Sequence, residues 1–148
     1  QPSYLREVLG REDGAPPAVD LAREKRHGGF IRTLINGAQV SAVHDISDGG
    51  ILAATVEMAL ASGFGANLVD MDHGQLFGEG QARYLVTCAE TAAADLIASG
   101  RAKGIEVIHI GTVTPEAALN VGTSASISLA ELRAVHEGWF PAYMAGEL

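Results

Sequence analysis

The segment from His44 to Gly50 combines residue types that could bind a phosphorylated ligand. It reads His-Asp-Ile-Ser-Asp-Gly-Gly and follows a short apolar run at residues 40–43. The two glycines would let the backbone turn sharply and approach a ligand closely. A helix that begins here would point its first unpaired N–H groups, the positive end of its dipole, at that ligand. The candidates for a nucleotide or phosphate site are Ser47, Asp48, Gly49 and Gly50.

Two further residues of this segment have side chains that could act on a ligand. The Asp45 carboxylate could hold Mg²⁺, a cation that binds through oxygen. His44 is the candidate general acid or base by residue type, and it could equally be a structural histidine at the end of a strand. A structural interpretation of the whole segment also stays open, because Ser47 or Asp48 could simply cap the helix.

A second polar cluster lies about thirty residues further on. Residues 77–83 read Phe-Gly-Glu-Gly-Gln-Ala-Arg, so Glu79, Gln81 and Arg83 bring a carboxylate, an amide and a guanidinium together just before a strand. The intervening glycines favour a backbone that stays open to a ligand. The alternative is a solvent-exposed loop in which Arg83 pairs with Glu79.

Composition limits the function classes. The chain has 18 acidic and 10 basic residues and a net charge of -8. No basic face is visible, which argues against nucleic-acid binding through phosphates. The single cysteine, Cys88, cannot form an internal disulfide. It lies in an apolar stretch, so we expect it to be a small buried side chain. The histidines and acidic residues do not have the spacing of a zinc site, and P-loop and nucleophile-elbow sequences are absent.

No apolar run approaches the roughly 18 residues that a membrane helix needs. The N-terminus has neither an initiator methionine nor the pattern of a signal peptide. We therefore expect a cytoplasmic domain without a membrane partner, taken from a longer chain. Residues 1–18 are predicted to be a linker or packing arm, and residues 19–148 one domain.

Hydrophobic periodicity and turn residues predict the elements that position both clusters. We expect helices from Val19 to Asn36, from Gly50 to Ala61 and from Glu90 to Ser99. Strands are expected at residues 40–43, 67–71 and 83–88, with a loop at 72–80.

The C-terminal third predicts a β segment at 105–113 that forms a hairpin with 118–121 across Pro115. Ser128 and Glu131 form a capping-box pattern, so a last helix should run from Leu129 towards Gly138. An aromatic tail at 139–143 should then dock on an apolar surface. Strands that alternate with helices and end in a hairpin favour a mixed sheet over a purely parallel one.

Together these segments resemble the C-terminal domain of phosphoribosylformylglycinamidine synthase. The resemblance rests on the paired motifs at 42–51 and 77–84. It extends to the opening from Tyr4-Leu5-Arg6 to Ala15-Pro16-Pro17, to the helix start Val19-Asp20-Leu21 and to the tail Glu137-Gly138-Trp139-Phe140-Pro141, and so covers almost the whole chain.

The resemblance implies an α+β fold, a three-layer α/β/α arrangement with a mixed β-sheet, like the related domain of aminoimidazole ribonucleotide synthetase. It implies a ligase that converts formylglycinamide ribonucleotide to its amidine with ATP, Mg²⁺ and ammonia. The ammonia would come from glutamine through a glutaminase domain or subunit, and the remaining synthetase domains would be partners. The isolated domain is expected to be inactive.

The resemblance places the chain in the second of two pseudo-symmetric halves. In the first half, the counterpart of Asp45 is a metal ligand, and the counterpart of residues 79–81 is a Glu-Ser-Gln substrate loop. Here Gly80 replaces the hydroxyl residue, which favours an auxiliary nucleotide site or a structural role. The alternatives are a non-catalytic interaction domain of the same synthetase, or another ATP-dependent member of the superfamily.

Overall fold

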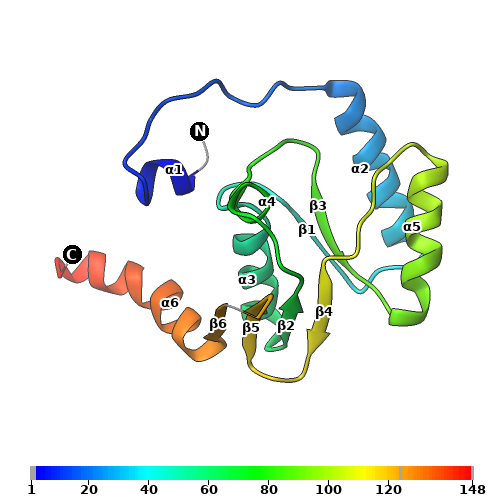
Figure 1. Cartoon of the computed structure of the whole chain (residues 1–148). Coiled ribbons are helices and arrows are strands. Elements are labelled where there is room, and N and C mark those ends of the chain that lie inside the picture. Colours follow the sequence, from blue (N-terminus) through cyan, green and yellow to red (C-terminus); the bar gives the residue numbers. More distant parts are fainter. Residues whose placement is uncertain (1–2, 124, 148) are drawn as a thin grey trace. The chain divides into compact units, whose positions relative to one another are not determined.

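The computed structural model describes residues 3–123 and 125–147, which form two compact units. Of these residues, one unit contains 3–54 and 72–109, and the other contains 55–71, 110–123 and 125–147. The elements in chain order (Figure 1) are α1 (Ser3–Glu7), α2 (Leu21–Asn36), β1 (Ala42–Asp45), α3 (Gly50–Ser62), β2 (Gly65–Leu68), α4 (His73–Phe77), β3 (Tyr84–Thr87), η1 (Glu90–Ala92), α5 (Ala93–Ala102), β4 (Gly111–Thr114), β5 (Ala118–Val121), β6 (Ala125–Ser128) and α6 (Leu129–Ala145).

The first unit is organised around helix α2 and the antiparallel pair β1–β3. The Asp20 side chain caps α2 by accepting a hydrogen bond from the Arg23 N–H, and Gly37 ends the helix. In the strand pair, Ala42 lies opposite Thr87 and Asp45 lies opposite Tyr84. Both candidate loops therefore begin or end at the same end of this pair.

The core of the first unit lies between α2 and α5. Phe30 and Leu34 are one helical turn apart on α2 and pack with Leu96 of α5 and with Ile105. Cys88 is half-buried and packs against this cluster, so its surroundings agree with the predicted packing role.

The second unit contains a four-stranded sheet in the order β4-β2-β5-β6. β2 pairs with β5 in parallel and with β4 antiparallel, and β5 pairs with β6 antiparallel. The prediction of an α+β fold with a mixed sheet is confirmed.

Several boundaries differ from the sequence prediction. The expected hairpin between 105–113 and 118–121 is wrong, because β2 lies between β4 and β5. Residues 72–80 contain helix α4, which a capping box of Asp72 and Gln75 starts. Strand β6 was not predicted, and α6 continues through Gly138 and Pro141 to Ala145. Among the described residues, no helix is long and apolar enough to cross a membrane.

Candidate functional site

The turn between β1 and α3 needs glycine for local reasons. Gly49 and Gly50 have φ angles of 78° and 71°, a region that side chains with a Cβ rarely adopt. A Cβ at Gly50 would lie 2.5 Å from the main-chain oxygen of Leu76. The close approach of α4 to the start of α3 therefore requires glycine at position 50, whether or not a ligand binds.

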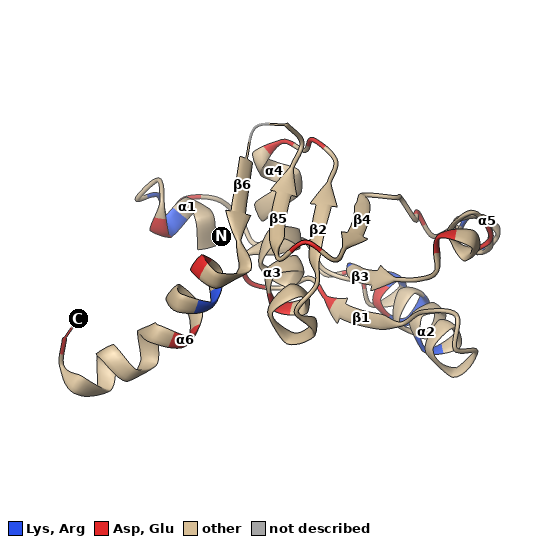
Figure 2. Cartoon of the chain, turned by 90° about the horizontal axis from the view of Figure 1, so that it is seen from below, with Lys and Arg blue, Asp and Glu red and all other residues tan. Residues whose placement is uncertain are grey.

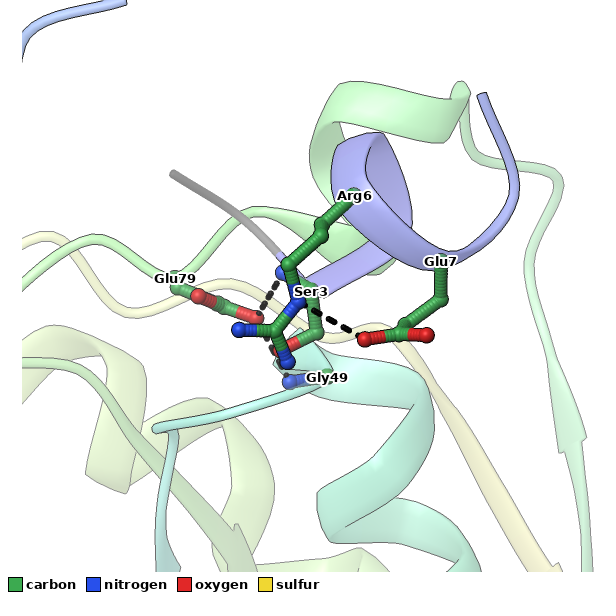
Figure 3. A network of polar contacts seen from close by, with 5 residues as sticks. All are labelled: Ser3, Arg6, Glu7, Gly49 and Glu79. Carbon is green, nitrogen blue, oxygen red and sulfur yellow. Dashed lines mark hydrogen bonds and ion pairs between the residues drawn. The ribbon is translucent and has the colours of Figure 1, made fainter. Parts of the chain in front are cut away.

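The Glu79 carboxylate joins the two candidate loops. Its Oε1 accepts a hydrogen bond from the Gly49 N–H at 2.8 Å and another from the Ser3 N–H at 2.7 Å. Figure 3 shows the carboxylate between these two donors, which belong to the turn before α3 and to α1. Partial burial raises the pKa of Glu79, but these hydrogen bonds outweigh it, and the net pKa is lower than usual. Glu79 is therefore held as a carboxylate.

This arrangement has a direct consequence for the predicted phosphate site. The N–H of Gly49, which was expected to face a phosphate, already donates to a carboxylate of the chain itself. The Gly50 N–H donates to the Ser47 main-chain oxygen at 3.1 Å. A phosphate could use these two donors only by displacing Glu79 and opening the turn.

The N-terminal arm packs on the second loop through α1. The Tyr4 ring stacks on Phe77 of α4, with ring centroids 4.3 Å apart and an angle of 21° between the planes. Tyr4 also stacks on His73 at 5.6 Å. The arm is thus held at two points, by aromatic stacking and by the Ser3–Glu79 hydrogen bond.

The two motif loops line a single open cleft of about 640 Å³ in the first unit. The arm and the start of α2 complete its walls. The lining residues are Ala15, Pro17, Glu24, Asp45, Ile46, Ser47, Asp48, Gly78, Glu79, Gly80, Gln81, Ala82, Arg83 and Tyr84. Six of the nine predicted site residues therefore come together, while His44, Gly49 and Gly50 are outside the lining.

Arg83 is the cationic side chain of the cleft lining. Its Nη1 donates to the Gly78 main-chain oxygen at 2.8 Å, and among the described residues it makes no ion pair with a carboxylate, so the Arg83–Glu79 pair of the solvent-loop alternative is not formed. Burial, and to a smaller extent the positive charge of Arg23, lower the pKa of Arg83 below its usual value. Arg83 stays charged at neutral pH and has further N–H groups for an anionic ligand.

His44 has a local partner instead of a place in the cleft. Its Nδ1 lies 2.6 Å from the main-chain oxygen of Asp45 and so donates a hydrogen bond to it. This contact holds the ring of His44 against the main chain of its own strand, β1.

The carboxylates of the cleft suit Mg²⁺ only in combination with a ligand. Asp45 ends strand β1 and Asp48 lies in the turn that follows it. Both are exposed, and the Asp45 side chain is 70% exposed. Among the described residues, no group of three or more His, Cys, Asp or Glu side chains is arranged to hold a metal. Mg²⁺ is commonly bound by one or two carboxylates together with substrate phosphates and water, and these residues fit that mode.

The residues that support the loops from a distance were not among the predicted site residues. His27 of α2 lies with its Nδ1 2.8 Å from the main-chain oxygen of Ala82, and Ala82 has a positive φ of 58°. No local pattern marks His27, because its partner is 55 positions away. The roles of Ser3 and Tyr4 were also missed, since the arm has neither a long apolar pattern nor a strong capping sequence.

Comparison with protein families gives one match over most of the chain. The model of the family described as "AIR synthase related protein, C-terminal domain" matches residues 3–123.

Curated relatives match almost the whole chain. A phosphoribosylformylglycinamidine synthase subunit PurL of Rhodospirillum rubrum is 51% identical over 149 residues, which is 99% of this chain and 20% of the relative. A subunit of the same name from a Bradyrhizobium species is 48% identical, with the same coverage. The chain thus spans about a fifth of the length of these relatives.

Solved structures share the fold at lower identity. Thermotoga maritima PurL complexed with FGAR has a TM-score of 0.74 and 20% identity, over 88% of this chain and 24% of that chain. The same protein complexed with ATP has a TM-score of 0.72 and 21% identity, over 81% of this chain and 23% of that chain.

Proposed function

This chain belongs to the family of AIR synthase related C-terminal domains, and we propose that it is a domain of an ATP-dependent phosphoribosylformylglycinamidine synthase. The names and identities of the relatives support this assignment. The activity would belong to a longer cytoplasmic polypeptide, because the chain spans only 20% of these relatives. We expect the chain alone to be inactive.

The proposed reaction is that of a ligase. Formylglycinamide ribonucleotide, ATP and glutamine-derived ammonia would give the amidine, with Mg²⁺ on the ATP phosphates. The partners would be the remaining synthetase domains and a glutaminase domain or subunit. ATP would activate the amide oxygen of the substrate by phosphoryl transfer, which depends on positioned phosphates and on stabilisation of developing charge.

The observation that carries the proposal is that both motif loops line one cleft and are joined by the Glu79–Gly49 hydrogen bond. We assign Arg83 to an anionic group of the nucleotide and Gln81 to a hydrogen bond with it. Asp45, with Asp48, would hold Mg²⁺ together with a ligand phosphate.

The remaining predicted residues have supporting roles in this proposal. Ser47 would add a hydroxyl to the ligand, and Glu79 would position the loops. Gly49 and Gly50 would contact phosphate only after Glu79 moves away. Residues 1–18 would act as a packing arm that forms one wall, since Ala15 and Pro17 line the cleft.

A second candidate function is a purely structural domain of the same synthetase. The observation in its favour is that the Gly49 and Gly50 N–H groups are already satisfied inside the chain. In that case the cleft would be a vestige of a nucleotide site, and Glu79 would permanently fill the place of an anion.

Hydrogen exchange in the full-length synthetase tests the first candidate. ADP with Mg²⁺ should slow exchange in segments 44–50 and 78–84, and Arg83→Ala should abolish this effect. Arg101→Ala is the matched control, because Arg101 is exposed on α5 away from the cleft lining. Unchanged exchange in both segments at saturating nucleotide would reject the nucleotide site and favour the structural domain.

A further inference from the structure

The second half of helix α6 exposes a continuous apolar face. Val135, Trp139 and Tyr143 are four residues apart, and Phe140 and Met144 form the adjacent row. Each of these five side chains, which we call the α6 stripe, is between 57% and 75% exposed. Figure 2 shows that the charged residues of α6 are confined to its first half. The largest contiguous apolar patch on a soluble protein is often a site of interaction.

Helix α6 has well-defined ends and an unfavourable middle. Ser128 caps its start, and Gly146 closes its end in the left-handed conformation, with a φ of 73°. Gly138 and Pro141 both lie inside the helix, where they weaken it. Helices in proteins gain most of their stability from packing on an apolar face.

Among the described residues, the buried side chain and the side-chain hydrogen bond that hold α6 to its own unit both belong to its first turns. Leu129 is buried, and Arg133 donates from Nη2 to the Leu60 main-chain oxygen at 2.8 Å. The α6 stripe lies beyond these contacts. The α6 helix continues through Gly138 and Pro141, and its large apolar side chains are exposed there. Both features indicate that another surface packs on this half of the helix.

The size of the α6 stripe helps to identify that surface. Each of the three aromatic side chains would bury about 150–250 Å² if it were fully covered, and each is roughly 60% exposed. Together with Val135 and Met144, they expose on the order of 500 Å² of apolar surface. A stable complex of separate molecules typically buries about 800 Å² per partner. Docking within one polypeptide needs less area, because the tether raises the effective concentration.

The comparisons place α6 beyond the family domain but inside the longer relatives. The family model ends at residue 123, before α6 begins, whereas the Rhodospirillum relative aligns over 99% of this chain and is about five times as long. A covering surface in the same polypeptide is therefore available in such a protein.

We propose that the α6 stripe docks on an apolar surface of another domain of the same synthetase polypeptide. The proposal rests on the proposed function, in that it needs the longer chain. The Trp139 and Tyr143 rings stack on each other with centroids 5.2 Å apart and form the centre of the contact. Their indole N–H and hydroxyl require polar partners at its edge.

Hydrogen exchange of segment 133–147 tests the docking without any variant. It should be at least about tenfold slower in the full-length synthetase than in the 148-residue chain alone. Helix α2 serves as the internal reference, whose exchange should be the same in both. Equal exchange of 133–147 in the two proteins would refute the docking.

A variant pair localises the contact. Trp139→Ser combined with Tyr143→Ser should return exchange of 133–147 in the full-length protein to the rate of the chain alone. Leu21→Ser is the matched control, because Leu21 is equally apolar and 75% exposed on α2, and it should have no such effect. If the 148-residue chain instead dimerises at micromolar concentration with 133–147 protected, the partner is a second copy and the proposal is wrong.

The same samples with ADP and Mg²⁺ separate this inference from the proposed function. Protection of 133–147 without any nucleotide effect on 44–50 and 78–84 supports the docking and rejects the nucleotide site. A nucleotide effect without protection of 133–147 supports the nucleotide site and rejects the docking.

Discussion

The cleft loops and the second half of helix α6 differ in where their stabilising contacts come from. Around the cleft, Glu79 bridges Gly49 and Ser3, and Arg83 contacts Gly78, so the polar groups find partners inside the first unit. The α6 stripe instead exposes five large apolar side chains. The cleft should therefore keep its geometry in the isolated chain, whereas α6 should depend on its surroundings.

The largest effect should come from the glycine at the start of α3. Gly50→Ala should destabilise the chain by about 3 kcal/mol or more, because it combines a positive φ with a clash against the α4 main chain. Urea unfolding of the isolated chain measures the loss. Gly63→Ala is the matched control, with a φ of 78° and no atom near the new Cβ, and it should cost only about 1–2 kcal/mol. Equal losses would mean that the approach of α4 can relax.

Removing the charge of Glu79 should have the next largest effect. Glu79→Gln weakens two hydrogen bonds to a charged acceptor, and we expect a loss of about 1–3 kcal/mol. Urea unfolding at neutral pH measures it, and Glu106→Gln, an exposed glutamate of the same unit, is the control that should lie near zero. A loss no larger than that of the control would show that the bridge between the loops contributes nothing.

The pH dependence of stability should also show the contribution of the Glu79 carboxylate. Because the pKa of Glu79 is lower in the folded chain, its contribution is fully present above the unfolded pKa of about 4.3 and is lost as pH falls through the folded pKa. The wild-type chain should therefore lose more stability than Glu79→Gln between pH 5 and pH 3. Parallel pH profiles of the two proteins would contradict the lowered pKa.

The sequence predicted the cleft better than it predicted the sheet. Residues 44–50 and 77–83 were identified because glycine and charge are dense there, and the structure brings both segments to one cleft. The family resemblance drawn from them is confirmed by the family match and the relatives. The insertion of β2 between β4 and β5 could not be read locally, because parallel pairing joins segments about fifty residues apart.

The contacts that hold the loops could not be predicted from the sequence for a related reason. The Ser3–Glu79 and His27–Ala82 hydrogen bonds join residues 76 and 55 positions apart, and each uses a main-chain atom that carries no sequence signal. Arg83 and Glu79 suggested an ion pair by proximity in sequence. Each has a main-chain partner instead, since backbone groups at the turn would otherwise lack hydrogen bonds.

The smallest effect should come from α6 in the isolated chain. Trp139→Ser should change the free energy of unfolding by no more than about 0.5 kcal/mol, because the side chain is 57% exposed and, within the described part of the chain, stacks on Tyr143 alone. Circular dichroism during urea unfolding measures it, with Trp139→Phe as the conservative control. A loss comparable to that of Glu79→Gln would mean that Trp139 already packs inside the isolated chain. The contrast with the cleft would then disappear, because both regions would be held by contacts of this chain alone.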